Sequence, residues 1–133
     1  MPPPSDQLKP EPRVLVAIPA HNEAGRIGDV VRAVRTVLPD VDIAVINDDS
    51  RDATATEAAT AGAWVLPLAT NLGYGAALET AYLLARDRDY DIVLQMDGDG
   101  QHLAAELPRL LGPILNGEAD LVLGSRFGAH SGP

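Results

Sequence analysis

The chain contains no cysteine and a single lysine, and aromatic residues make up only 4% of it. Without cysteine, disulfides, zinc–thiolate sites and thiol nucleophiles are excluded. The formal net charge of −9 argues against a nucleic-acid-binding surface, because such surfaces need clustered lysine and arginine. No apolar run is long enough to span a bilayer, and residues 1–5 lack the apolar core of a signal peptide. These absences favour one acidic globular domain, which we expect in the cytoplasm.

Short apolar runs alternate with amphipathic segments along the chain. The runs predict strands at residues 13–18, 41–46, 63–66, 91–96 and 120–123, with Pro19 stopping the first. Apolar residues at helical spacing predict helices at residues 27–38, 53–61, 76–86 and 106–115, and Asp52 or Ser50 can cap the second. This alternation is typical of an α/β fold with a mainly parallel sheet and helices on both faces.

The ends of the chain differ in composition from its centre. We expect residues 1–12 to be a disordered proline-rich arm, residues 13–128 to form the folded domain and residues 129–133 to be a flexible tail. Little chain follows the last predicted strand, so its outer edge would be unpaired. Because an unpaired strand invites pairing, we expect association with a partner chain or with a second copy as a homodimer.

Polar residues gather directly after the predicted strands. They occur at residues 19–23, 47–50, 97–102 and 125–126. The carboxyl ends of parallel strands meet at one edge of a sheet, which is where open α/β sheets bind ligands. No Gly-x-Gly-x-x-Gly follows the first strand and no Gly-Lys-Ser/Thr is present, which argues against a dinucleotide fold and a P-loop.

Asp97 and Asp99 directly follow the predicted strand at residues 91–96. Residues two apart in extended backbone point to the same side, so both carboxylates face one spot. Paired carboxylates suit a hard divalent cation, which commonly accompanies phosphates. The alternative is a polar turn, since Asp-Gly-Asp-Gly is also favourable turn sequence. A calcium EF-hand loop starting at Asp97 is excluded, because His102 stands where that loop needs glycine.

Five motifs together resemble those of family 2 glycosyltransferases. They are VAIPAHNEAGRIGDVV, INDDSRDAT, NLGYGAA, MDGDGQH and GSRF, in that order, and the resemblance spans about residues 13–128. Within that family, the chain is most similar to the dolichyl- or polyprenyl-phosphate mannosyl- and glucosyltransferase type. The resemblance implies the Rossmann-like GT-A fold, a GDP- or UDP-hexose donor, Mg²⁺ or Mn²⁺, and inversion at the anomeric carbon.

The resemblance also implies roles for individual residues. The nucleotide-binding residues would be Pro19, Glu23, Asp48 and Asp97, the metal ligands Asp97, Asp99 and Gln101, and the catalytic residues Asp99 and Arg126. Asp48 matches a loop carboxylate that meets the base, and Arg126 an arginine that faces phosphate. Each has an alternative role: Glu23 as a first-turn helix acid favoured by the helix dipole, Asp48 as a loop acid, and Arg126 as a surface charge.

The chain departs from the family pattern in two respects. Asn47 stands where the family usually has Asp, and Asp49 where it often has Gly or Asn, which leaves the base undetermined. Family members also continue well beyond the Gly-Ser-Arg motif, so this chain resembles the donor-binding half. We expect hexose transfer to a polyprenyl phosphate at the inner membrane surface, with little or no turnover by this chain alone. The alternatives are a non-catalytic sugar-nucleotide-binding module of a split enzyme and transfer to a small acceptor such as a glycerate.

Overall fold

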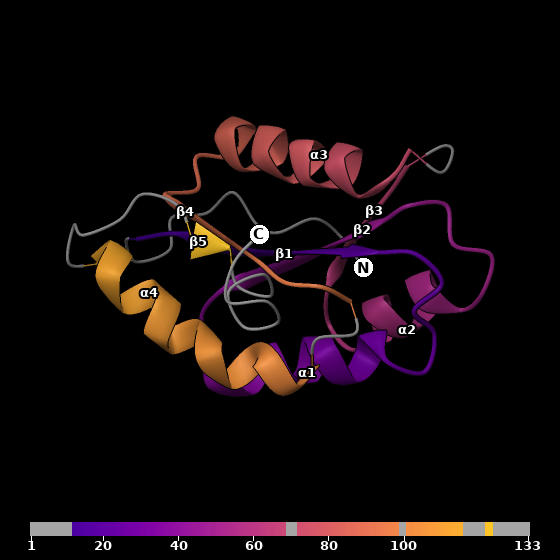
Figure 1. Ribbon diagram of the computed structural model, residues 1–133, viewed down its shortest axis with the longest axis horizontal. Helices are drawn as coiled ribbons and strands as arrows, with labels where there is room; N and C mark the ends of the chain where they lie inside the picture. Colours follow the sequence, from indigo (N-terminus) through magenta and orange to yellow (C-terminus); the bar gives the residue numbers. More distant parts are fainter. Residues whose placement is uncertain (1–11, 69–71, 99–100, 116–121, 124–133) are drawn as a thin grey trace.

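Five parallel strands form a single sheet in the computed structural model, which describes residues 12–68, 72–98, 101–115 and 122–123 (Figure 1). The strands are β1 (Val14–Ala20), β2 (Asp42–Asn47), β3 (Trp64–Pro67), β4 (Ile92–Gln95) and β5 (Val122–Leu123). Their order across the sheet is β3-β2-β1-β4-β5. The predicted parallel α/β fold is thereby confirmed. The predicted tail, and the predicted arm apart from residue 12, lie outside the described residues.

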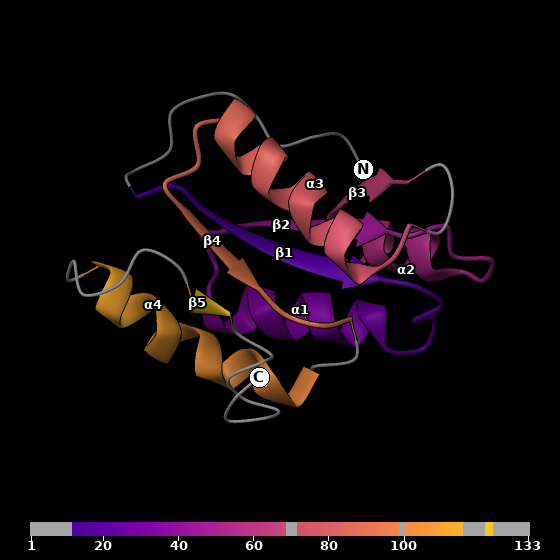
Figure 2. The same ribbon diagram turned by 45° about the horizontal axis from the view of Figure 1, so that its top comes forward.

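Helices cover both faces of this sheet. They are α1 (Ile27–Val37), α2 (Thr54–Thr60), α3 (Tyr74–Asp87), the 3₁₀ helix η1 (Gln101–Glu106) and α4 (Leu107–Leu115). Figures 1 and 2 show α3 on one face and α1, α2 and α4 on the other. Within the described ranges, no helix combines the length and the apolar character needed to cross a bilayer.

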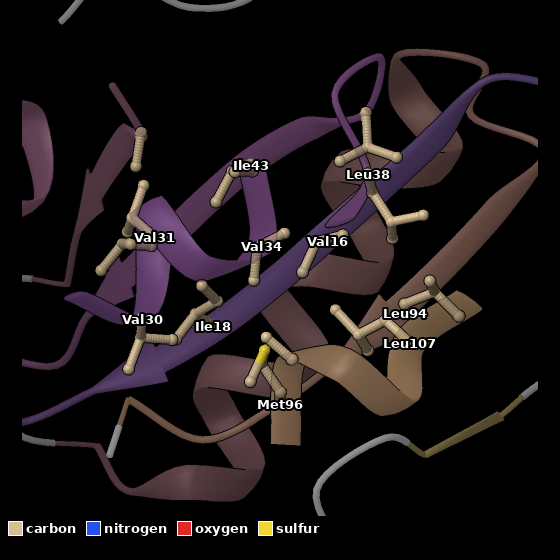
Figure 3. Close-up of a cluster of buried hydrophobic side chains, with 14 of the residues drawn as sticks. Val16, Ile18, Val30, Val31, Val34, Leu38, Ile43, Leu94, Met96 and Leu107 are labelled. Atoms are coloured by element: carbon tan, nitrogen blue, oxygen red, sulfur yellow. The ribbon is translucent and has the colours of Figure 1, made fainter. Parts of the chain in front are cut away.

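The central strand β1 is buried along its whole length, and its side chains alternate between two cores. Val16 and Ile18 join the larger core, beneath α1 (Figure 3), whereas Leu15 and Ala17 join the smaller core, beneath α3. This is the period of two that a strand imposes. Each large side chain that is fully buried here contributes about 1.5–3 kcal/mol relative to exposure.

Helix α3 approaches the sheet mainly through alanine, and Leu84 also packs against the smaller core. Ala77, Ala81 and Ala85 are at most 4% exposed and recur every fourth residue, so they form one stripe along the helix. Because alanine has no atom beyond Cβ, the helix backbone can lie close to Leu15 and Ala17. Helix α1 instead fills the space above the opposite face with valine and isoleucine.

The prediction that Pro19 stops the first strand is wrong, because β1 continues through Pro19 to Ala20. Successive residues of a strand direct their backbone groups to opposite neighbouring strands, so residues two apart face the same one. Ala17 accepts a hydrogen bond from the N–H of Met96, so Pro19 faces the same side, toward β4. The β1–β4 register ends at Ala17 and Gln95. Proline is therefore tolerated where the neighbouring strand has already ended, because no ladder hydrogen bond is lost.

Ala81→Leu is predicted to destabilise the protein, because the stripe under α3 has no room for a larger side chain. We expect a loss of about 1–3 kcal/mol in the free energy of unfolding, measured by urea denaturation. Ala105→Leu, at an exposed position of η1, is the matched control and should change stability by less than about 0.5 kcal/mol. Equal effects of the two substitutions would contradict the close packing of α3.

Candidate donor site at the carboxyl edge of the sheet

The loops that follow β1 and β2 are joined by reciprocal hydrogen bonds. The register of the two strands ends with Ala20 opposite Asn47, and the next N–H, that of Asp48, donates to the carbonyl of Ala20 at 2.8 Å. Further out, the N–H of Asn22 donates to Oγ of Ser50 at 3.0 Å. The side-chain oxygen of Asn22 in turn accepts from the N–H of Arg51 at 2.9 Å. The two loops therefore form one connected unit at the carboxyl edge of the sheet.

Asp48 holds the turn that leads into α3. It is only 5% exposed. One carboxylate oxygen accepts the N–H of Leu72 at 2.7 Å, and the other accepts the N–H of Gly73 at 2.8 Å. Gly73 has a φ of +93°, a conformation that favours glycine. A carboxylate can accept about four hydrogen bonds, so capacity for a ligand remains. The contact of Asp48 with a base stays a prediction.

The loop after β4 lies against the loop after β1. A Cβ atom placed on Gly98 would lie 3.0 Å from Cγ of Glu23, 3.3 Å from Cβ of Ala20 and 3.4 Å from the carbonyl oxygen of Pro19. Only a residue without a side chain fits this approach comfortably. Asp97, which precedes Gly98, is half-buried. The tertiary structure thus places Gly98, the residue next to the predicted site residue Asp97, against two other predicted site residues, Pro19 and Glu23.

Two of the predicted site residues, Asp99 and Arg126, lie outside the described residues. Gln101 begins η1, but its side chain lies outside the description as well. Within the described part of the chain, to which Asp99 does not belong, no three acidic or histidine side chains cluster as metal ligands. The donor set itself, two carboxylates and an amide oxygen, suits Mg²⁺ or Mn²⁺. The metal site therefore stays a prediction, with Asp97 as its described member.

Helix α1 begins without a capping side chain of its own, since Arg26 at its N-cap makes no such hydrogen bond. Side chains from the start of α2 accept the preceding N–H groups instead. The N–H of Glu23 donates to Oγ1 of Thr54 at 2.8 Å, and that of Ala24 donates to Asp52 at 3.1 Å. Glu57 accepts the N–H of Gly25 with both oxygens, at 2.9 and 3.1 Å.

Sequence reasoning found only part of this arrangement. The predicted capping residue Asp52 lies one position before the N-cap of α2, which is Ala53 and makes no side-chain capping bond. Asp52 instead accepts the N–H of Thr54, the first residue of α2, at 3.0 Å. The sequence pattern did not predict that the residues before α1 are hydrogen-bonded by Asp52, Thr54 and Glu57. A signal was present: no Ser, Thr, Asp or Asn stands directly before Ile27, so the caps had to come from another segment.

The carboxylate of Asp52 is the most strongly hydrogen-bonded acid of this unit. The hydroxyl of Thr54 donates to it and lowers its pKa, an effect that outweighs the opposing effect of desolvation. The N–H groups of Thr54 and Ala24 lower the pKa further. All of these bonds favour the ionised form.

The chain resembles glycosyltransferases along most of its length. The model of the family described as "Glycosyl transferase family 2" matches residues 15–133. An undecaprenyl-phosphate mannosyltransferase of Micrococcus luteus is 37% identical over 119 residues, which cover 86% of this chain and 48% of that protein. A polyprenol monophosphomannose synthase of Mycolicibacterium smegmatis is 36% identical over 126 residues, or 90% of this chain and 47% of that protein. The chain thus spans about half the length of these two relatives.

Solved structures agree with this similarity. The crystal structure of glucosyl-3-phosphoglycerate synthase from Mycobacterium tuberculosis, in complex with Mn²⁺, UDP-glucose and phosphoglyceric acid, superposes with a TM-score of 0.67. Its sequence is 26% identical, and the match covers 81% of this chain and 41% of that one. The same synthase in complex with UDP gives a TM-score of 0.69 at 27% identity, covering 81% of this chain and 42% of that one. The common fold is therefore a nucleotide-sugar transferase fold of the GT-A type.

The hydrogen bonds to Asp52 predict that the protein loses thermal stability in acid as this carboxylate becomes protonated. Since its pKa is lowered on folding, the stabilisation is fully present above the unfolded-state value of about 4 and is lost as the pH falls below it. Asp52→Asn should therefore lower the thermal midpoint at neutral pH. As the pH falls, the midpoint of this variant should decrease less than that of the unmodified protein. Asp40→Asn, which changes an exposed carboxylate, should leave the acid profile nearly as it was. Parallel acid profiles for the unmodified protein and Asp52→Asn would contradict the assignment.

Proposed function

Because the chain belongs to glycosyl transferase family 2, we propose that its folded part binds the nucleotide-sugar donor of an inverting, metal-dependent hexosyltransferase. The observation that carries this proposal is the approach of Gly98 to Glu23 and Pro19. It joins the predicted nucleotide corner after β1 to the predicted metal and diphosphate loop after β4. These two strands are neighbours at the point where strand order reverses, which is the usual ligand crevice of open α/β sheets.

The hydrogen bonds at the start of α1 support the metal dependence. In many α/β proteins the first helix N-terminus binds phosphate through free N–H groups. Here the N–H groups of Glu23, Ala24 and Gly25 are already accepted by side chains of the neighbouring loop. The surrounding carboxylates, among them Asp97, would also repel a diphosphate. A cation is therefore the most direct way to compensate the charge of the donor.

The predicted ligands of that cation are Asp97, Asp99 and Gln101. Bound there, it would neutralise the negative charge that develops on the leaving nucleoside diphosphate. The acceptor oxygen attacks the anomeric carbon from the face opposite to that diphosphate, so that one C–O bond forms as the other breaks with inversion. Pro19, Glu23 and Asp48 bind and orient the nucleotide in this proposal.

We propose a polyprenyl phosphate as the acceptor. The names of the two mannosyltransferase relatives, at 36–37% identity, support this choice. A phosphate acceptor is already anionic near neutral pH and needs no general base for deprotonation, whereas an alcohol would need one. Arg126 is the residue that we expect to face that phosphate. A lipid acceptor also puts the reaction at a membrane surface, which we expect to be the cytoplasmic one.

A small phosphorylated acceptor is the second candidate. It is favoured by the likeness to glucosyl-3-phosphoglycerate synthase, whose structure was solved with phosphoglyceric acid, but the identity there is only 26%. A sugar-nucleotide-binding module of a split enzyme is the non-catalytic alternative. Transfer assays with each acceptor, and with a chain that supplies the rest of a full-length relative, discriminate among the three.

Donor binding is predicted to depend on the metal. A thermal-shift panel of UDP-glucose and GDP-mannose should show stabilisation by at least one of them in Mn²⁺ or Mg²⁺ and none in EDTA. A donor concentration of about 100 times the Kd should raise the free energy of unfolding by about 2.7 kcal/mol. Calorimetry that gives the same affinity in EDTA would overturn the metal role. Absence of binding by either nucleotide sugar under all conditions would overturn the proposed function.

The acidic residues Asp99 and Asp49 are predicted to differ in their importance for metal-dependent donor binding. Asp99→Asn should abolish metal-dependent donor binding, because it removes a proposed ligand charge. Asp49→Asn should change it little, since Asp49 has a φ of +54°, which asparagine tolerates equally well. Titrations of the two variants at equal Mn²⁺ concentration make the comparison. Equal losses would show that the assignment of the loop after β2 is wrong.

A further inference from the structure

Thr54 connects the start of α2 to the start of α1 through a single hydroxyl group. The side chain is fully buried, at 0% exposure. Its oxygen accepts the N–H of Glu23 at 2.8 Å, and its hydrogen is donated to the carboxylate of Asp52. A hydroxyl has one hydrogen to donate, so both ends of this bridge are specified. Glu23 therefore has its backbone position set by a residue 31 positions further along the chain.

Asp52 completes the bridge with a second attachment. One of its oxygens accepts both the N–H and the hydroxyl of Thr54, and the other accepts the N–H of Ala24 at 3.1 Å. Two consecutive N–H groups, those of Glu23 and Ala24, are thus held by two side chains that are themselves hydrogen-bonded to each other. Such a pair restrains rotation of the backbone at Glu23 as well as its translation.

The position of this backbone matters for the loop after β4. The Cγ of Glu23 lies where a Cβ on Gly98 would be only 3.0 Å away. The carboxylate of Glu23 is also ion-paired with Arg26 at 2.9 Å, and the Glu23 side chain is 20% exposed. A shift of the backbone at Glu23 would therefore move its carboxylate relative to both Arg26 and the Asp97–Gly98 loop. Errors of about 1 Å in such an arrangement are enough to weaken function strongly.

We propose that Thr54 and Asp52 are positioning residues for the donor site, which hold the Glu23 carboxylate where it meets the nucleotide sugar. This inference rests on the proposed function. Neither residue touches the donor; both act through the backbone at Glu23 and Ala24. They add to the loop after β2 a role that is separate from any contact of Asp48 with the base.

Thr54→Val is the most direct test, because it keeps the shape of the side chain and removes the hydroxyl. The N–H of Glu23 then has no acceptor and Asp52 loses a donor. We expect the Kd for UDP-glucose or GDP-mannose, whichever binds the unmodified protein in Mn²⁺, to rise by about tenfold. Thr54→Ser keeps the hydroxyl and should restore binding to within about twofold. Thr60→Val, at the exposed end of α2, is the matched control and should bind like the unmodified protein.

Calorimetry well below each thermal midpoint, with circular dichroism on the same samples, separates affinity from folding. A role in stability alone would lower the midpoint of Thr54→Val and leave the Kd unchanged, which would overturn the inference. If Thr54→Val does not fold, Asp52→Asn is tested in the same way. An amide at position 52 would direct N–H toward the N–H of Ala24 or toward Thr54, so weaker donor binding is expected and equal binding would again overturn the inference. An unmodified protein that binds neither nucleotide sugar would instead overturn the proposed function, and this inference with it.

Discussion

The strand order reverses at β1, and this reversal sets the positions of the loops and helices around it. The chain adds β2 and β3 on one side of β1 and then returns to add β4 and β5 on the other. Because all five strands are parallel, the loops after β1 and β4 leave the sheet side by side. This placement allows Gly98 to approach Glu23, and it requires both faces of β1 to be covered, which explains the uninterrupted burial of that strand.

The loop after β2 supports the site from the other side of β1. Its side chains satisfy N–H groups that two other segments leave open: Asp48 accepts those of Leu72 and Gly73, and Thr54 and Asp52 accept those of Glu23 and Ala24. Each of these bonds joins residues far apart in the chain. One consequence is electrostatic. Because the N–H groups at the start of α1 are already hydrogen-bonded, they are not free to bind phosphate, and the negative charge of a diphosphate has to be compensated by another group.

Sequence patterns predicted the elements well because their signals are local. The alternation of apolar runs and amphipathic segments predicted the parallel sheet and its helices. The error at Pro19 has the opposite cause. Whether a proline ends a strand depends on whether a neighbour is present to be paired, and here β4 has already ended at Gln95. That information is not contained in the residues around Pro19.

The site likewise combines features that follow from local sequence with features that depend on distant segments. Local sequence patterns were enough to predict which residues stand after each strand, and with them the acidic, oxygen-rich chemistry of Glu23, Asp48 and Asp97, since strand ends and residue types are local properties. The folded arrangement was needed to show that Gly98 lies against Glu23, that both oxygens of Asp48 are bonded to the turn before α3, and that Thr54 accepts the N–H of Glu23 before α1. These contacts join loops whose separation in space is set by the packing of the strands and helices between them, and no pattern within one segment encodes that distance.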